Sequence, residues 1–394
     1  MTLLYVNVRR THLERSAVFD AAHRLGHDVV LLCDSVPEGL PGGVRPHRVD
    51  TTDDAAVDAV LAGLATVDGV LGFSEKDVRA VSRIAVRLGL PGPGVEAARL
   101  ARDKVAMRAA VAAVAPGDVP RFAAVTTAGD LGRALDVVGV PGVLKPAASS
   151  GSRGIFIVRD RAEARAAHDH LAGFGDLVYE EFMPGSEHSV EGFVHKGEVL
   201  VAAITDKRTL EPFRIELAHL QPTGLPEEVQ SAVLALTTRV VGALGLDSCA
   251  FHLECMVGPD GRVRLVEIGA RGGGDFIASH LVGLSTGRSF VEDALLVATG
   301  CAPLLGTGPR AGACVRKLVT SSEGVVRTVE GLDEVARTPG VRHIVVEQPV
   351  GSLVRQPPAD YKSSILGAVI TAGDTAATAA AAAERAADAF RITM

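Results

Sequence analysis

One lysine, three serines and two glycines stand together in the segment VLKPAASSGSRGIFIV, residues 143–158. Lys145 ends an apolar run that we predict to be a strand, and a loop of small residues, 147–154, leads into a second apolar run. Gly151 and Gly154 would let backbone N–H groups approach phosphate oxygens, while the lysine would supply a positive charge. Hydroxyl donors would come from Ser149, Ser150 and Ser152. Because the loop joins two predicted strands rather than a strand and a helix, we predict a flap over a phosphate, with an ordinary flexible hairpin as the alternative.

Two glutamates lie on a second predicted hairpin, around the turn at 258–261. If the four turn residues form the loop, Val257 faces Arg262, and Glu254 and Glu267 become diagonal neighbours about 7 Å apart on one face. Two like charges at that distance repel unless a cation lies between them, and carboxylate oxygens suit Mg²⁺ that also binds nucleotide phosphates. We therefore predict a magnesium site, the alternative being two solvent-facing glutamates on an amphipathic hairpin.

Two further cationic residues are candidates for binding an anion. Arg271 follows Glu267 by four residues and is flanked by three glycines, which admit close backbone approach, so it could hold a carboxylate or a developing oxyanion. Lys104 starts a predicted helix and would add a second charge at a phosphate, with a solvated lysine as the alternative.

The composition favours small-molecule chemistry. A chain of 394 residues with 47% hydrophobic residues predicts two to three domains with sizeable cores. A net charge of −7 and 4% aromatic residues give no general attraction to nucleic acid or to an anionic membrane surface. Five cysteines without a CxxC pair indicate reduced thiols, and no apolar run approaches the ~18 residues of a membrane span. The first apolar run lacks the preceding charges of a signal peptide, so we expect a cytoplasmic protein.

The elements that must position these residues begin with an alternation of strands and helices. Residues 3–8 and 28–33 read as strands on either side of a helix over 12–25, which is the rhythm of a parallel sheet. No GxGxxG follows the first strand, so the front block is Rossmann-like in layout without a dinucleotide site. Gly/Pro breaks and a change to hairpin-rich texture predict three domains. Their expected bounds are 1–94, 95–304 and 305–394.

Taken together and in this order, the motifs resemble the ATP-grasp superfamily of carboxylate–amine ligases over about residues 100–300. The resemblance implies a multidomain fold of α/β and α+β class: a Rossmann-like N-terminal domain, an ATP-grasp core of two subdomains and an α+β C-terminal domain. It also implies that Lys104 and Lys145 bind ATP phosphates beneath the flap over 147–154.

The run VYEEFMPGSEHSVEGF, residues 178–193, resembles the hinge between the two ATP-clamping subdomains, which we expect near 180–184. Glu187 is implied to contact the ribose hydroxyls. The residues implied to contact adenine are one of Glu180 and Glu181, together with the backbone of Phe182 and Met183.

Glu254 and Glu267 match the metal ligands of the family, and Arg271 matches the arginine near its acyl phosphate. One position departs from the pattern. Many members have Asn two residues after the second glutamate as an extra metal ligand, whereas this chain has Gly269. The departure implies metal coordination by fewer side chains.

Within the superfamily, HLECMV and VEIGARGGGDFI look most similar to the L-amino acid ligases that make dipeptides. His219, in HLQP, resembles a histidine that those enzymes place near the substrate, with a structural histidine as the alternative. Lys207, in TDKR, could reach the transferred phosphate, an exposed strand lysine being as consistent with the sequence.

The resemblance implies transfer of the ATP γ-phosphoryl group to an amino acid or similar acid, followed by attack of an amine that forms an amide or peptide bond and releases ADP and phosphate. It implies ATP and Mg²⁺ as cofactors, with two ions expected and Mn²⁺ as an alternative. The expected partners are a small-molecule acid and amine in natural product synthesis, without nucleic acid or membrane, and a homodimer stays an open expectation. The rival functions are a purine-pathway enzyme using bicarbonate or formate and a non-catalytic ATP-binding regulator.

Overall fold

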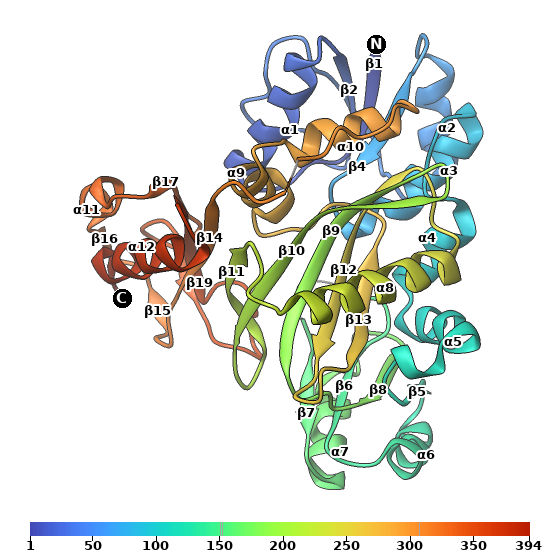
Figure 1. The fold of residues 1–394 in the computed structure, drawn as a ribbon, viewed down its shortest axis with the longest axis vertical. Coiled ribbons are helices and arrows are strands. Elements are labelled where there is room, and N and C mark those ends of the chain that lie inside the picture. The colour runs from blue at the N-terminus through green and yellow to red at the C-terminus, as the bar shows by residue number, and fades with distance from the viewer. Residues whose placement is uncertain (150, 152, 307) are drawn as a thin grey trace.

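The computed structural model describes residues 1–149, 151, 153–306 and 308–394. Ser150 and Ser152, two of the predicted flap hydroxyls, lie outside the described residues. Figure 1 shows three regions around long central strands: the N-terminal region in blue at the top, a small sheet with α6 and α7 at the bottom, and the C-terminal region in red at the left. The predicted multidomain fold of α/β and α+β class is confirmed.

The N-terminal region is built on a four-stranded parallel sheet in the order β3-β2-β1-β4, as the alternation of strands and helices predicted. Thr11 caps the first helix by accepting a hydrogen bond from the Glu14 N–H, and Gly26 follows its end with a φ of 68° that favours glycine. The strands are β1 Thr2–Val6, β2 Asp28–Cys33, β3 Arg45–Arg48 and β4 Gly69–Gly72. The helices are α1 His12–Arg24, α2 Asp54–Ala62, the short 3₁₀ turn Glu75–Asp77 and α3 Val78–Leu88.

A smaller antiparallel sheet, in the order β5-β8-β6-β7, carries the predicted flap. The flap segment joins two strands that pair antiparallel, as the sequence predicted. The strands are β5 Phe122–Val125, β6 Gly142–Pro146, β7 Phe156–Val158 and β8 Leu177–Glu181. The helices of this part are α4 Val95–Arg102, α5 Lys104–Val114, α6 Ala128–Val138 and α7 Arg161–His170.

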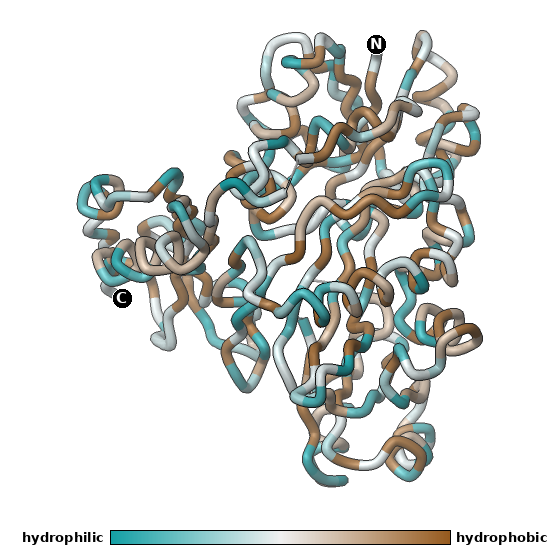
Figure 2. Tube along the Cα trace, viewed as in Figure 1, coloured by the Kyte–Doolittle hydropathy of each residue, from teal (hydrophilic) through white to brown (hydrophobic). Residues whose placement is uncertain are grey.

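The largest sheet has eight strands in the order β13-β12-β9-β10-β11-β14-β19-β17, so it runs from the core into the C-terminal region without a break. Helix α8, Glu227–Leu244, crosses it in Figure 1 and packs on it through apolar residues. Figure 2 shows that hydrophobic stretches follow the strands, whereas the outer loops are mostly hydrophilic. The strands are β9 Ser186–His195, β10 Glu198–Leu210, β11 Ile215–Gln221, β12 Cys249–Val257, β13 Val263–Gly269, β14 Gly312–Val319, β17 Val341–Val346 and β19 Ile365–Gly373.

The predicted register of the β12–β13 hairpin is wrong by two steps. The Gly258 N–H donates to the Arg262 carbonyl at 2.8 Å, so the loop has one more residue than the predicted turn. A bulge between Glu254 and Cys255 then leaves Val266 as an extra residue on β13. Since Glu254 pairs directly with Glu267, the two carboxylates are opposite neighbours rather than diagonal ones.

The remaining elements complete the C-terminal region and connect it to the N-terminal one. An apolar cluster joins β1, α1, α10 and the central sheet, with Tyr5, Phe193 and Phe290 fully or almost fully buried in it. The helices are the π-helical turn Ile277–Leu281, α9 Val282–Thr286, α10 Phe290–Ala298, α11 Leu332–Arg337 and α12 Ala376–Ala389. The short strands are β15 Gly324–Val325, β16 Thr328–Glu330, β18 Leu353–Val354 and β20 Arg391–Thr393.

All five cysteines have free thiols, in agreement with the absence of a CxxC pair. None of the helices in the described part of the chain combines the length and the apolar run that a membrane crossing needs.

Candidate active site

Lys145 and Glu180 face each other on the small sheet, where β6 and β8 are antiparallel neighbours. Lys145 Nζ lies 2.8 Å from Glu180 Oε2, and Nε of Arg108, on α5, lies 2.6 Å from the other carboxylate oxygen. All three side chains are buried. Burial lowers the pKa of Lys145 and Arg108 lowers it further, although Glu180 acts in the opposite direction. Two cations therefore share one carboxylate, an arrangement with positive charge in excess.

Lys104, the first residue of α5, connects the flap to the glutamate hairpin. Its Nζ donates to the carbonyl of Ser149 at 2.9 Å and lies 2.9 Å from Glu267 Oε2. Its backbone N–H bonds with the carbonyl of Ala147 at 3.0 Å. Lys104 is buried, which excludes the solvated lysine considered as an alternative.

The two flap glycines differ in how closely other residues pack against them. Gly151 and Gly154 both have a positive φ, 70° and 77°. A Cβ at Gly154 would lie 2.8 Å from Cδ2 of Leu171, whereas nothing lies within 4 Å of one at Gly151. Gly154 is therefore fixed by both backbone and packing, and Gly151 by its backbone alone.

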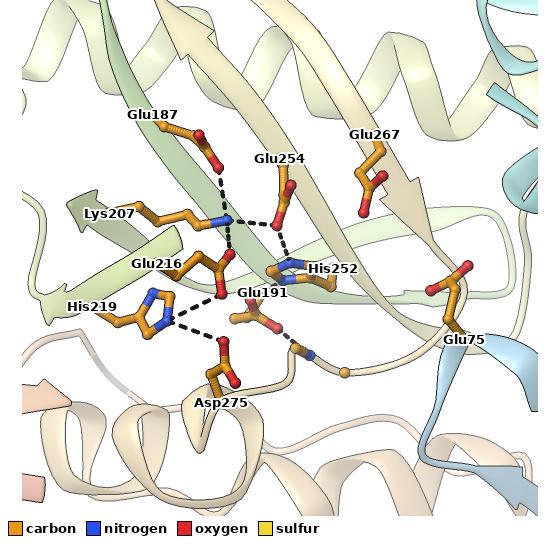
Figure 3. Close-up of polar contacts among 12 residues, drawn as sticks. Glu75, Glu187, Glu191, Lys207, Glu216, His219, His252, Glu254, Glu267 and Asp275 are labelled. Carbon is orange, nitrogen blue, oxygen red and sulfur yellow. Dashed lines mark hydrogen bonds and ion pairs between the residues drawn. The ribbon is translucent and has the colours of Figure 1, made fainter. Parts of the chain in front are cut away.

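Lys207, on β10, lies at the centre of three carboxylates (Figure 3). Its Nζ is 2.8 Å from Glu187, 2.6 Å from Glu216 and 2.6 Å from Glu254. The side chain is 1% exposed, so the alternative of an exposed strand lysine is wrong. Burial alone would lower the pKa of Lys207, but the three carboxylates raise it well above the ordinary value. Three carboxylates thus surround one ammonium group, and Arg214, Lys317 and His252 each contact one of the same carboxylates from outside.

One of the two hairpin glutamates, Glu254, belongs to a group of carboxylates close enough together to share a divalent cation, whereas Glu267 is not in that group. Glu254 and Glu267 are opposite each other, and Lys207 and Lys104 hold one carboxylate each. Burial alone would raise the pKa of Glu254, but Lys207 and then His252 lower it well below the ordinary value. Oxygen atoms of Glu187, Glu216 and Glu254 all lie within 4.8 Å of one another, and carboxylate oxygens are the ligands that Mg²⁺ prefers.

His252 was not identified from the sequence, although it precedes Glu254 by two residues and therefore shares its face of the strand. Its Nδ1 lies 2.5 Å from Oε1 of Glu191 and its Nε2 lies 3.1 Å from Oε1 of Glu254. Burial alone would lower the pKa of His252, but Glu191 and Glu254 raise it to about 9. The other oxygen of Glu191 accepts the Gly273 N–H at 2.9 Å, so the histidine connects the hairpin to the glycine-rich segment.

Arg271 forms an ion pair with Glu75, a residue of the N-terminal region that is labelled in Figure 3. Arg271 Nε lies 2.9 Å from Oε2 of Glu75, and Nη1 of Arg102 lies 3.3 Å from Oε1. A Cβ at Gly269 would lie 2.5 Å from Oε2 of Glu75. The position at which the family pattern has Asn is thus the space that the Glu75 carboxylate fills.

His219 lies in a second charged cluster and has no exposed surface. Its Nε2 is 3.7 Å from Glu216 and 3.6 Å from Asp275, and neither ring nitrogen has a hydrogen-bond partner among the described residues. Nζ of Lys317 lies 2.5 Å from Asp275 and 3.5 Å from Glu216. Sequence reasoning missed Glu216, Asp275 and Lys317, which come from three separate segments.

The predicted adenine contacts lie at and after the end of β8. Glu181 pairs with Arg264 at 3.3 Å, at the side of the hairpin. The Phe182 N–H donates to the carbonyl of Pro141 at 3.2 Å, and Met183 follows it, half-buried. Of the candidates in this stretch, Glu187 is the one that reaches the Lys207 cluster.

Three family models match parts of the chain. The model of the ATP-grasp domain matches residues 138–279, that of the ATP-grasp N-terminal domain matches 19–92, and that of the L-amino acid ligase C-terminal domain 2 matches 316–394. The segment with the flap, the charged clusters and the hairpin lies inside the first match.

Curated relatives include alanine–anticapsin ligase of Bacillus subtilis, 28% identical over 249 residues, which are 56% of this chain and 52% of the relative. Human carnosine synthase 1 is 28% identical over 292 residues, covering 67% of this chain and 35% of the relative. The chain spans about half the length, or less, of these curated relatives.

Among solved structures, the L-amino acid ligase from Bacillus licheniformis matches with a TM-score of 0.87 and 25% identity, covering 100% of this chain and 98% of that one. The phosphoribosylglycinamide synthetase from Anaerococcus prevotii matches with a TM-score of 0.77 and 19% identity over 100% and 99% of the two chains. The second likeness shows the fold alone.

Proposed function

Because this chain belongs to the ATP-grasp superfamily, we propose that it is an ATP-dependent ligase that joins the carboxylate of an amino acid, or a similar acid, to an amine. The observation that carries the proposal is the pair of Glu254 and Glu267, which are partly buried and directly opposite each other, with Lys207 and Lys104 on their carboxylates. Burying so many charges is costly, and a triphosphate with its divalent cation is a ligand that such charges match.

Lys104 and Lys145 would bind the phosphates beneath the flap, with its glycine N–H groups as further donors. The Glu180 carboxylate forms ion pairs with Lys145 and Arg108. We therefore propose that the residues next to Glu180 contact adenine instead. These are Glu181 and the backbone of Phe182 and Met183, with Glu187 on the ribose.

Glu254 and Glu267 would hold Mg²⁺, with two ions expected and Mn²⁺ as an alternative. When bound, the ion would neutralise charge on the phosphoryl oxygens. The fit rests on an all-oxygen donor set and on two ammonium groups, Lys104 and Lys207, that can turn from the carboxylates to the phosphates.

The proposed reaction has two steps. The γ-phosphorus bonds to a carboxylate oxygen of the acid as its bond to the ADP oxygen breaks, and the amine nitrogen then attacks the carbonyl carbon, expelling phosphate and losing a proton. Lys104 and Lys145 position the phosphates, and Arg271 stabilises first the carboxylate and then the oxyanion. The flap, tied to Lys104 through Ser149, would exclude water from the acyl phosphate.

We assign Lys207 to the transferred phosphate. We assign His219, whose Nε2 lies between Glu216 and Asp275, to the acid substrate. The expected domains remain part of the proposal, 1–94 as scaffold, 95–304 for ATP and 305–394 as closing region. The free thiols favour a cytoplasmic location.

The test is ADP release from ATP with Mg²⁺ over a grid of carboxylic acids and amines, offered singly and in pairs. Pair-dependent release with an amide product supports the ligase. Glu267→Ala should abolish release, and Glu198→Gln, at an exposed position on β10, serves as the matched control. Release that depends on bicarbonate or formate alone would favour a purine-type enzyme, and ATP binding without any release would favour a regulator.

A further inference from the structure

Aromatic side chains from three separate parts of the chain meet beside β7, the strand that follows the flap. Phe156 comes from β7 itself, Phe213 from the turn between β10 and β11, and Tyr361 from the loop between β18 and β19, residues 355–364. The ring centroids of Phe156 and Phe213 lie 6.4 Å apart and those of Phe213 and Tyr361 lie 6.0 Å apart, both edge to face. Edge-to-face pairs are attractive, so Phe213 connects the small sheet to the C-terminal region, and the β10–β11 hairpin lies between the two in Figure 1.

The loop that carries Tyr361 is held in shape by its own hydrogen bonds. The Ser363 hydroxyl accepts the Arg355 N–H at 2.9 Å and donates to the Arg355 carbonyl at 3.1 Å, which closes the base of the loop. Within the loop, Oδ1 of Asp360 accepts the N–H of Lys362 at 2.8 Å. The aromatic ring of Tyr361 is therefore presented from a constrained segment.

The hydroxyl group of Tyr361 lies next to the flap. Burial raises the pKa of Tyr361, and the N–H of Gly154, the last residue of the flap, lowers it. The hydroxyl oxygen is buried, yet among the residues that the structure describes it has no hydrogen bond of ordinary geometry. Because an unpaired buried hydroxyl is costly, this oxygen is suited to accept the Gly154 N–H when the flap closes.

The two ends of the flap are thus fixed by different regions. At the first end, the Lys104 N–H donates to the carbonyl of Ala147 at 3.0 Å, and Lys104 belongs to the part of the chain that carries the small sheet. At the last end, Gly154 packs against Leu171, and the additional contact comes from Tyr361 in the C-terminal region. The C-terminal region can therefore influence the last end of the flap without touching the phosphate-binding lysines.

The turn that carries Phe213 also reaches the candidate active site. Nη2 of the next residue, Arg214, lies 2.5 Å from Oε2 of Glu187, whose other oxygen lies 2.8 Å from Lys207. Two neighbouring residues of one turn thus contact the row of aromatic rings and the carboxylates around Lys207. Movement of this turn would affect both places.

Resting on the proposed function, we propose that Tyr361 and Phe213 are positioning residues that hold the last end of the flap over the phosphates. They act through Phe156 and Gly154. The C-terminal region thereby determines how completely water is excluded from the acyl phosphate. If the contact is loosened, water competes with the amine and converts the acyl phosphate into the free acid and phosphate, so ADP is released without an amide.

The test is the number of ADP molecules released per amide formed, both measured in one reaction with an accepted acid and amine. Tyr361→Ala removes the ring and the hydroxyl and should raise this ratio about fivefold or more, because the flap is no longer held in place. Tyr361→Phe keeps the edge-to-face contact and should raise the ratio less. Phe174→Ala removes an exposed ring, 40% accessible, next to the same small sheet and should leave the ratio unchanged as the matched control.

The ratio separates positioning from stability. A variant that only folds less well loses ADP release and amide formation in equal proportion, so its ratio stays that of the wild type. Phe213→Ala interrupts the row of rings at its centre and keeps the proposal testable if Tyr361→Ala does not fold. The double variant should be no worse than Phe213→Ala, since both substitutions break the same contact.

The two proposals fail differently. If the wild type releases no ADP in response to any pair of acid and amine, the ligase is refuted. If the wild type forms the amide, but a folded Tyr361→Ala or Phe213→Ala keeps the wild-type ratio of ADP to amide, the positioning role of the C-terminal loop is refuted and the ligase stands.

Discussion

Lys145 and Lys207 are both buried strand lysines in the same site, yet their surroundings move their pKa values in opposite directions. Lys145 shares one carboxylate with Arg108, and its pKa is lowered, whereas Lys207 contacts three carboxylates, and its pKa is raised. The difference teaches that the ratio of partners, and not burial, decides the sign. A cluster with excess positive charge is suited to phosphate, and one with excess negative charge is suited to a cation.

The largest expected effect comes from removing the cation that three carboxylates share. Lys207→Met should lower the free energy of unfolding by about 3–5 kcal/mol in metal-free buffer, because Glu187, Glu216 and Glu254 would repel one another. Urea denaturation measures the loss. Added Mg²⁺ should restore part of it, and an unchanged stability in metal-free buffer would contradict the assignment of the cluster.

Removing the other lysine should affect catalysis more than folding. Lys145→Met leaves Glu180 paired with Arg108, so the fold loses less than in Lys207→Met, but a phosphate loses its point charge. We expect ADP release to fall about 100- to 1,000-fold in kcat. Steady-state kinetics check this against Lys196→Met, at an exposed turn position. Activity within threefold of the wild type would show that Lys145 does not face the phosphate.

A smaller effect is expected where the N-terminal region meets the site. Glu75→Gln weakens the hold on Arg271, and Gly269→Ala displaces the Glu75 carboxylate from its space, so each should lower kcat/KM about tenfold. The double variant should be no worse than either single one, since both remove the same contact. Gly242→Ala, at an open helix position, is the control, and additive losses would refute the link.

The smallest expected effect concerns two histidines, whose pKa values also depend on the number of carboxylate partners. His252 has two carboxylate partners and a raised pKa, whereas burial and the neighbouring His343 lower the pKa of His280 to about 4. An imidazole whose pKa is lower in the folded protein loses stability as the pH falls from about 6.5 towards 4. Between pH 7 and 5.5 the wild type should therefore lose about 1 kcal/mol more than His280→Phe in urea denaturation. The exposed His12→Phe should behave as the wild type, and equal losses in all three proteins would contradict the lowered pKa.

Much of the fold could be predicted because periodicity is a local property. The alternation of strands and helices gave the parallel N-terminal sheet, and the small-residue loop was placed correctly between two strands. The hairpin register could not be predicted, because it depends on one backbone hydrogen bond in the loop and on a bulge at Val266, whose carbonyl accepts from the distant Arg108.

Some residues of the candidate site could be predicted from the sequence and others could not. The flap and hairpin residues are contiguous in sequence and could be named, and their roles stay predictions. Glu75 and Glu216 could not, because each reaches the site from a segment whose own sequence carries no motif. Asp275 stands in the run VEIGARGGGDFI, but its contact with His219 joins segments far apart in the sequence. His252 could have been found from its spacing to Glu254.

The continuous eight-stranded sheet has a consequence for evolution and engineering. Four residues of β11 pair with β14, so a chain cut near residue 304 would leave the backbone groups on that side of β11 without partners, while the side that faces β10 stays paired. Such an edge is a template for intermolecular pairing. C-terminal regions exchanged between relatives would therefore have to preserve the β11–β14 seam, and chimeras that ignore it should aggregate even when every active-site residue is retained.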